Sequence, residues 1–393
     1  MTDVRTSKHD SITQSSPSDQ VWRGVASLLD QYICLKDTDS VLLLYARDAR
    51  EPTAWVAAEL SARGITPALI DLNSISASDM NSGPLTTGFM DKLSKASIRP
   101  DSIRDRLVVV VIEYDTITPS EWIRAALAPL PSAQVVAFRT IMAGREFFEQ
   151  GVTVSPATLN NINAGLLNKL RSAERFRIKS SSGTDLEVTL DPTRYRWVSN
   201  RGIPREKAFV FLPAGEVATY PAHISGVLVA DGAFNSTAYT KLDARLRDHP
   251  VVTEIEDGRA VNYSCESDPV RKLIERCLSL PNADRVGELG FGTNIGIEHF
   301  IPLNSHLNER YPGVHIGFGQ NNQGKHVLYE CDVHLDLILA DCTIEIPGES
   351  PLLSSDFKDL GGEHPAIETG VYDEDIDGDC CGLFSAYNPR QCQ

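Results

Sequence analysis

The sequence has no long run of lysine or arginine, and its 53 acidic residues against 37 basic ones give a formal net charge of -16. Binding to nucleic acid requires a basic face, so we expect no nucleic-acid partner. The longest apolar run, residues 107–112, is too short to span a bilayer, and the first 20 residues contain no apolar stretch typical of a signal peptide. We therefore expect a cytoplasmic protein without a membrane partner.

Two common cofactor signals are also missing. The eight cysteines form no C-x-x-C pair, which argues against a structural zinc site. In a reducing compartment, most of these cysteines are expected to be small, buried hydrophobic residues. The glycine-rich segment 319–326 ends in His326 where a phosphate loop needs Ser or Thr, and the turn at 46–50 has no glycine that a pyrophosphate could approach. We therefore expect neither a nucleotide nor a dinucleotide site.

With 393 residues, 42% of them hydrophobic, the chain is long enough for two or three domains. In its first part, short apolar strands alternate with helical segments, as in a parallel sheet with helices on its faces. The strands are expected at 40–45, 65–72, 107–114 and 134–138, and the helices at 52–63 and 120–128. This alternation predicts an α/β fold that begins with a Rossmann-like parallel-sheet domain.

The rhythm changes after a helical stretch at 155–174. Residues 176–190 have the pattern of a hairpin, and strands then dominate as far as Glu345, interrupted by a helix near 269–280. The second part is therefore predicted to be a strand-rich α+β domain. The expected order is a disordered N-terminus at 1–20, an α/β N-terminal domain at 21–150, a metal-binding catalytic domain at 151–347 and an acidic, cysteine-containing tail at 348–393.

Two glutamates stand in unusual surroundings. Glu216 follows Gly215 shortly after an apolar strand at 208–212, where its carboxylate can face a cleft. Glu288 is the single acidic residue of an apolar, glycine-rich strand at 286–292. A buried carboxylate needs a base or a metal ion as compensation. Glu288 is thus a candidate either for an ion pair with an arginine or for a metal ligand or catalytic residue. Glu216 is a candidate of the same kind, with an exposed loop glutamate as the alternative.

The strongest metal signal is the segment around His334-Leu-Asp336. Side chains alternate along a strand, so His334 and Asp336 are expected on one face with apolar neighbours on the other. An imidazole and a carboxylate placed in this way can share one cation. His315, which follows a Pro-Gly turn and precedes small residues, is a further candidate ligand.

Five motifs in this order resemble the thermophilic aminopeptidases of the aminopeptidase T and S type, a family of metallopeptidases. They are LPAGEV around Glu216, GVLVADG at 226–232, GELGFGTN around Glu288, VHIGFG around His315 and HLD at 334–336. The resemblance implies an enzyme that cleaves peptides with two divalent cations (Zn, Co or Mn). We also expect the chain to form a homodimer. It also implies the metal ligands, which are Glu216, Glu288, His315, His334 and Asp336. The family has a tyrosine where this chain has Asn322.

The same motifs are similar to those of 2,5-dihydroxypyridine dioxygenase, a ring-cleaving iron enzyme. This second resemblance implies one Fe(II) held by His315, His334 and Asp336. That enzyme lacks an acidic residue corresponding to Glu216, so the presence of Glu216 and Glu288 here favours the metal-dependent hydrolase. A third alternative is a non-catalytic protein that binds a peptide or small molecule on the same fold.

Overall fold

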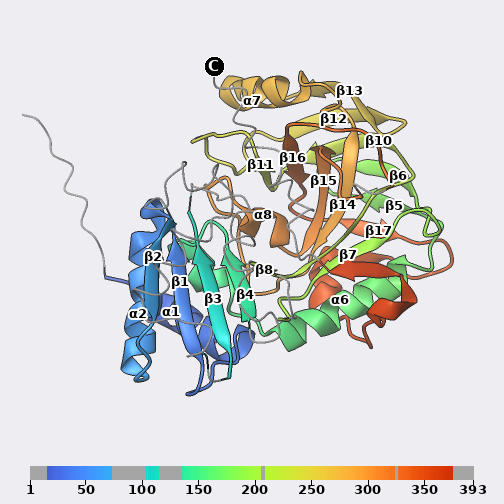
Figure 1. Ribbon diagram of the computed structural model, residues 1–393. Helices are drawn as coiled ribbons and strands as arrows, with labels where there is room; N and C mark the ends of the chain where they lie inside the picture. The colour runs from blue at the N-terminus through green and yellow to red at the C-terminus, as the bar shows by residue number, and fades with distance from the viewer. Residues whose placement is uncertain are drawn as a thin grey trace, which may run out of the picture.

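The computed structural model of the chain describes residues 16–72, 103, 105–114, 135–204, 209–323 and 326–374. It is a mixed α/β fold in which one parallel sheet is joined to two larger, strand-rich sheets (Figure 1). The parallel sheet and its helices form one side of the molecule, and the strand-rich sheets form the other. The α/β class predicted from the sequence is confirmed.

The first sheet has five parallel strands. Their order is β2 (Ala68–Asp71), β1 (Ser40–Tyr45), β3 (Leu107–Ile112), β4 (Val135–Thr140) and β8 (Phe209–Leu212). The central strand β3 is buried along its whole length, as expected where both faces of a parallel sheet are covered. One face packs against α1 (Asp19–Ser27), α2 (Arg50–Ala62) and a π-helical turn at Phe147–Gly151.

The boundaries of this part differ from those expected. Helix α1 begins at Asp19 with Ser18 as its N-cap, so helical structure starts before residue 21. Residues 1–15 and the helix expected at 120–128 lie outside the described residues. Strand β8 belongs to the first sheet although it follows the boundary expected near 150. The chain therefore returns to the parallel sheet before it completes the strand-rich part.

The other two sheets have seven strands each and are antiparallel except for one pair. The second sheet has the order β13 (Arg259–Ser264), β12 (Val251–Glu256), β10 (His223–Ala230), β6 (Asp185–Thr189), β5 (Arg175–Lys179), β17 (Thr343–Glu345) and β18 (Leu352–Leu353). The third sheet has the order β11 (Ala233–Ser236), β16 (His334–Ile338), β15 (Gly313–Gly319), β14 (Val286–Gly292), β9 (Glu216–Thr219), β7 (Trp197–Asn200) and β19 (Tyr372–Glu374).

The second and third sheets share one apolar core. Leu186 of β6 belongs to the same buried cluster as Ile316 of β15 and Leu335 of β16. Helices α6 (Pro156–Leu170) and α7 (Asp268–Leu278) add apolar side chains to this core. One face of the third sheet is therefore committed to packing, and polar side chains can gather only on its other face.

The sequence predicts an acidic tail from residue 348, but the segment up to Glu374 packs on the fold. Strand β18 pairs with β17, and β19 adds a parallel strand beside β7. Phe357 and Tyr372 are buried. These two aromatic side chains supply the apolar surface with which this acid-rich segment packs on the fold. Residues 375–393, which include the predicted cysteine-containing end, lie outside the described part.

A short link carries the chain from the first sheet to the third. Strand β8 ends at Leu212, and β9 begins at Glu216. Asn294 Nδ2 donates a hydrogen bond of 2.8 Å to the carbonyl oxygen of Ala214 in this link. Glu216 is thereby fixed at the junction of the parallel sheet and the strand-rich part. No helix among the described residues combines the length and apolar character needed to cross a membrane.

Candidate metal centre

Alternation along the strands of the third sheet separates an apolar face from a polar one. The core residues on these strands include Val217, Leu289, Ile316, Leu335 and Leu337. The polar residues next to them in sequence are at most 2% exposed, and they are Glu216, Glu288, His315, His334 and Asp336. Four neighbouring strands, β9, β14, β15 and β16, thus bring all five candidate residues together on one face.

Each of these side chains has a glycine as its neighbour on the adjacent strand. The register pairs Glu216 with Gly292, Glu288 and Asp336 with Gly317, His315 with Gly290, and His334 with Gly319. A Cβ atom added to Gly317 would lie 2.8 Å from His334 Cε1 and 3.0 Å from Asp336 Oδ1. The glycine-rich motifs of the sequence therefore make room for polar side chains that approach the backbone closely.

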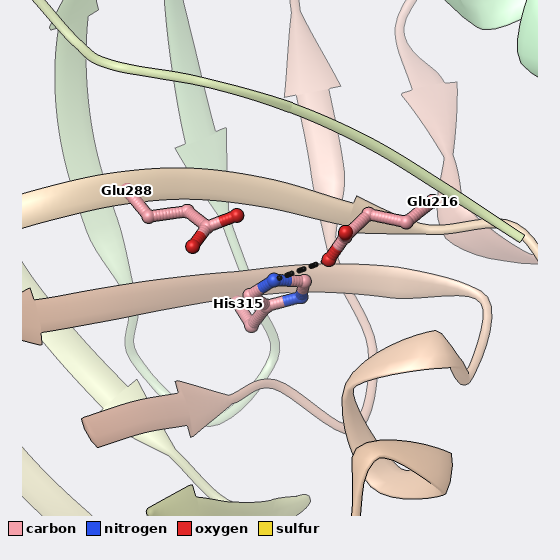
Figure 2. A group of neighbouring side chains, drawn as sticks. All are labelled: Glu216, Glu288 and His315. Carbon is pink, nitrogen blue, oxygen red and sulfur yellow. Dashed lines mark ion pairs between the residues drawn. The ribbon is translucent and has the colours of Figure 1, made fainter. Parts of the chain in front are cut away.

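The five residues form two groups of possible ligand atoms. Within each group these atoms lie within 4.8 Å of one another: the first triad is Glu216, Glu288 and His315, and the second triad is Glu288, His334 and Asp336. In Figure 2 the carboxylates of Glu216 and Glu288 approach from two sides, with the His315 imidazole beside them. Glu288 belongs to both triads, so its carboxylate could serve as a ligand in either of them.

Contacts within the triads orient their imidazole rings. His334 Nε2 lies 2.8 Å from Asp336 Oδ1 and 3.4 Å from Glu288 Oε2. His334 Nδ1 lies 3.2 Å from the carbonyl oxygen of Gln320. A backbone carbonyl on the second ring nitrogen is the usual support of a metal-ligating histidine. In the first triad, His315 Nε2 lies 3.2 Å from Glu216 Oε1.

Several buried polar atoms of the triads have no hydrogen-bond partner among the described residues. They are Glu216 Oε2, both carboxylate oxygens of Glu288, His315 Nδ1 and Asp336 Oδ2. Leaving a buried carboxylate oxygen unpaired is costly, and carboxylate and imidazole atoms are ordinary ligands of divalent transition metals. The residues present therefore fit a divalent cation, which would compensate these atoms.

The crowding of carboxylates alters the pKa values of the second triad. Burial, with the charges of Glu216 and Asp336, raises the pKa of Glu288 well above its ordinary range. Burial also raises the pKa of Asp336 to about 6, although His334 opposes the shift. Burial alone would lower the pKa of His334, but the Asp336 carboxylate outweighs it and raises that pKa to about 9. Protons and a cation would thus compete for the same lone pairs.

Helix α8 (His306–Arg310) adds an arginine to the first triad. Arg310 Nη1 contacts Glu216 Oε1 and lies 3.0 Å from Glu309 Oε1. Burial opposes the ionisation of Glu216, but the charge of Arg310 outweighs it, and the pKa of Glu216 is lowered. Glu216 is therefore an ionised carboxylate that already has one cationic partner.

The same helix contributes His306 and Glu309, and both are buried. Asn235 Nδ2 donates a hydrogen bond of 2.8 Å to Glu309 Oε2, and neither ring nitrogen of His306 has a hydrogen-bond partner among the described residues. The sequence did not indicate these residues, because a five-residue helix has no periodicity that distinguishes it from an exposed turn. We refer to the two triads together with His306, Glu309 and Arg310 as the buried cluster.

Asn322, where the resemblance implies a tyrosine, lies in the loop after β15. Its side chain is buried, and Oδ1 accepts a hydrogen bond of 3.2 Å from Gln323 Nε2. Its Nδ2 atom has no hydrogen-bond partner among the described residues. The nearby Tyr329 hydroxyl donates to the Gly319 carbonyl at 2.9 Å. This loop therefore carries a buried amide where the resemblance would place a phenol.

The chain is similar to proteins of known structure along most of its length. It matches 2,5-dihydroxypyridine dioxygenase from Pseudomonas putida KT2440 at 17% identity and a TM-score of 0.54, over 84% of this chain and 93% of that one. It also matches wild-type AmpT from Thermus thermophilus at 16% identity and a TM-score of 0.48, over 85% of this chain and 97% of that one. The first likeness shows that this chain and the dioxygenase share a fold.

A protein family described as crocagin biosynthetic protein CgnE/B matches residues 222–346. This stretch is less than half of the chain, and it contains every candidate ligand except Glu216. No curated protein matches the sequence. The chain is an α/β protein with a candidate metal centre on the polar face of its third sheet.

Proposed function

We propose that the chain is a metal-dependent hydrolase that cleaves a peptide or amide bond. The observation that carries this proposal is the division of the five candidate ligands into two triads that share Glu288. Three of the five are carboxylates, and such sets of oxygen and imidazole ligands suit the divalent metals of hydrolases. A divalent cation held by these residues would supply Lewis-acid chemistry: it would polarise a carbonyl oxygen and lower the pKa of a bound water from about 15.7 towards about 7.

The unpartnered carboxylate oxygens suggest what the protein's own residues do. Glu216 Oε1 is held by Arg310, whereas Oε2 is buried and has no hydrogen-bond partner among the described residues. We assign Oε2 to the amino group of the substrate, because an ammonium group and a buried carboxylate compensate each other. Glu288 is assigned as a ligand of the cation, because it belongs to both triads.

Two of the comparisons support parts of this proposal. The fold shared with a dioxygenase supports catalysis rather than binding alone. The match of residues 222–346 to a family named for crocagin biosynthesis supports a role in a biosynthetic pathway. The expected homodimer and cytoplasmic location stay predictions.

A mononuclear iron dioxygenase is the second candidate, because an enzyme of that kind shares the fold. The iron ligands that the second resemblance implies are divided between the triads: His315 belongs to the first, and His334 and Asp336 belong to the second. An iron site in the second triad would have to use Glu288 in place of His315. It would then have one histidine and two carboxylates instead of the usual two histidines and one carboxylate, which favours the hydrolase.

Metal reconstitution tests the proposal. The purified full chain is stripped with a chelator, reloaded with Zn²⁺, Co²⁺, Mn²⁺ or Fe²⁺, and assayed with aminoacyl amides whose amino group is free or acetylated. We expect cation-dependent hydrolysis of the free-amino substrates only. His334→Ala and Asp336→Ala should lose both the cation and the hydrolysis. His223→Ala, which changes an exposed histidine of the second sheet, is the control and should retain both.

The other outcomes separate the alternatives. Oxygen consumption with a dihydroxypyridine by the iron-loaded chain, without hydrolysis, would establish the dioxygenase. If the chain retains none of the four metals, both metal-dependent enzymes are excluded, and the non-catalytic binding protein is the remaining alternative. Full metal content in both His334→Ala and Asp336→Ala would refute the assignment of these two residues as ligands.

A further inference from the structure

Arg310 is a buried positive charge within the cluster. Its side chain is 2% exposed, and its guanidinium is anchored at several points. Nη1 contacts Glu216 Oε1 and lies 3.0 Å from Glu309 Oε1, and Nε donates to the carbonyl oxygen of Pro213 at 3.3 Å. An arginine stays protonated throughout the pH range of a folded protein. The charge beside Glu216 is therefore permanent and held in place.

The two triads differ in their relation to this charge. In the first triad, Glu216 Oε1 is shared between Arg310 and His315 Nε2. In the second triad, the ion-pair contacts of Glu288 and Asp336 within the described part of the chain are with His334. A cation in the first triad would have to share a carboxylate with a guanidinium. The carboxylates that a cation in the second triad would use have no ion pair with a guanidinium within the described residues.

Because the first triad is buried, the repulsion between the Arg310 guanidinium and a cation bound there would be strong. Like charges repel most strongly where water is excluded, and salt screens buried charges little. Arg310 cannot relieve the repulsion by losing a proton. If its side chain moved away, Glu216 and Glu309 would lose a shared counter-ion inside the protein, which is strongly unfavourable. The guanidinium and a cation in the first triad are therefore alternatives.

We propose that the Arg310 guanidinium takes the place of a second cation, so that the chain holds one divalent cation, in the second triad. This inference rests on the proposed metal-dependent function, and it replaces the two-ion site that the aminopeptidase resemblance implies. Arg310 is a positioning residue in this arrangement. It fixes Glu216 Oε1 and leaves Oε2 for the substrate amino group.

Metal stoichiometry tests the inference directly. The full chain and its variants are stripped, loaded with Mn²⁺, freed of unbound metal and analysed for metal equivalents per chain. We expect one equivalent in the parent and two in Arg310→Met, with the electron paramagnetic resonance of the second sample showing coupled Mn²⁺ ions. Arg139→Met removes another buried arginine, which pairs with Glu113 in the first sheet, and this control should keep one equivalent.

A second variant covers the case in which Arg310→Met does not fold. Glu216→Gln should keep the single equivalent, because Glu216 is not a ligand of the retained ion. Two equivalents in the parent, falling to one in Glu216→Gln, would overturn the inference and leave the proposed function standing. One equivalent in both the parent and a folded Arg310→Met would also overturn the inference and leave the proposed function standing. No bound metal in the parent would overturn the proposed function together with the inference.

Discussion

Gly290 lies against the imidazole of His315, so close that a Cβ atom on Gly290 would be 1.9 Å from His315 Nε2. The two residues are paired across strands β14 and β15. Nε2 is also the atom that lies 3.2 Å from Glu216 Oε1. The missing side chain of Gly290 is therefore what permits the contact between His315 and the carboxylate on β9.

Gly290→Ala should force the His315 ring away from Glu216. An extra methyl group in a packed interior costs about 1–3 kcal/mol of unfolding free energy, and we expect a loss of this size in urea unfolding. The metal content should stay at one equivalent, because His315 is not part of the second triad. A variant as stable as the parent would show that the site relaxes around the methyl group.

Gly317→Ala should instead weaken cation binding. Its Cβ atom would lie 2.9 Å from Glu288 Cβ and 2.8 Å from His334 Cε1, so two ligands of the second triad must shift. Displaced support of a metal site typically lowers affinity about 10- to 100-fold, which a competitive chelator titration measures. Gly313→Ala, on the same strand but with its nearest atom 3.6 Å away, is the matched control. Equal affinity in both variants would contradict the argument.

Much of the fold could be predicted from the sequence, because the spacing of hydrophobic residues along the chain indicated where strands and helices lie. The strand expected at 40–45 matches β1, and the hairpin expected at 176–190 corresponds to β5 and β6. The five candidate residues were found for a related reason: each is a polar residue within or beside an apolar strand, and such a residue is costly to bury without a partner. Their convergence on one sheet face follows from strand alternation.

What the sequence could not reveal depends on long-range contacts. Arg310 follows Glu309 in a short polar segment that looks like an exposed turn, yet both side chains are 2% exposed. Their burial results from α8 packing against β11, β14, β15 and β16, and no local pattern encodes it. Strand β19 was missed for the same reason, since a three-residue strand in an acidic segment is defined only by its partner β7.

Tyr372 should contribute substantially to stability although it lies in the segment that composition marks as a tail. Its side chain is buried on β19, Arg201 Nη2 lies 3.2 Å from its hydroxyl, and its ring makes an edge contact with His364. We expect Tyr372→Ala to lower the unfolding free energy by about 3–5 kcal/mol and Tyr372→Phe by about 1 kcal/mol, measured by urea unfolding. Tyr239→Ala, at a tyrosine that is 67% exposed, should change it by less than about 0.5 kcal/mol.

His364 gives the fold a pH dependence of defined sign. Its Nδ1 lies 3.1 Å from the Pro365 carbonyl oxygen and its Nε2 lies 3.0 Å from Ser199 Oγ. Burial, with a smaller effect of the Arg201 charge, lowers the pKa of His364 from its ordinary 6.5 to about 4. The unfolded chain therefore takes up a proton here at a higher pH than the folded chain. The stability that this residue contributes is present above about pH 6.5 and is lost as the pH falls to about 4.

His364→Gln should remove this component of the pH dependence. The difference in unfolding free energy between parent and variant should shrink by about 1–2 kcal/mol between pH 7 and pH 4, an amount reduced for the partial exposure of the ring. Taking the difference cancels the titration of the buried cluster, which both proteins share. A difference for His364→Gln that grows as the pH falls would mean that the folded protein binds the proton more tightly than the unfolded chain.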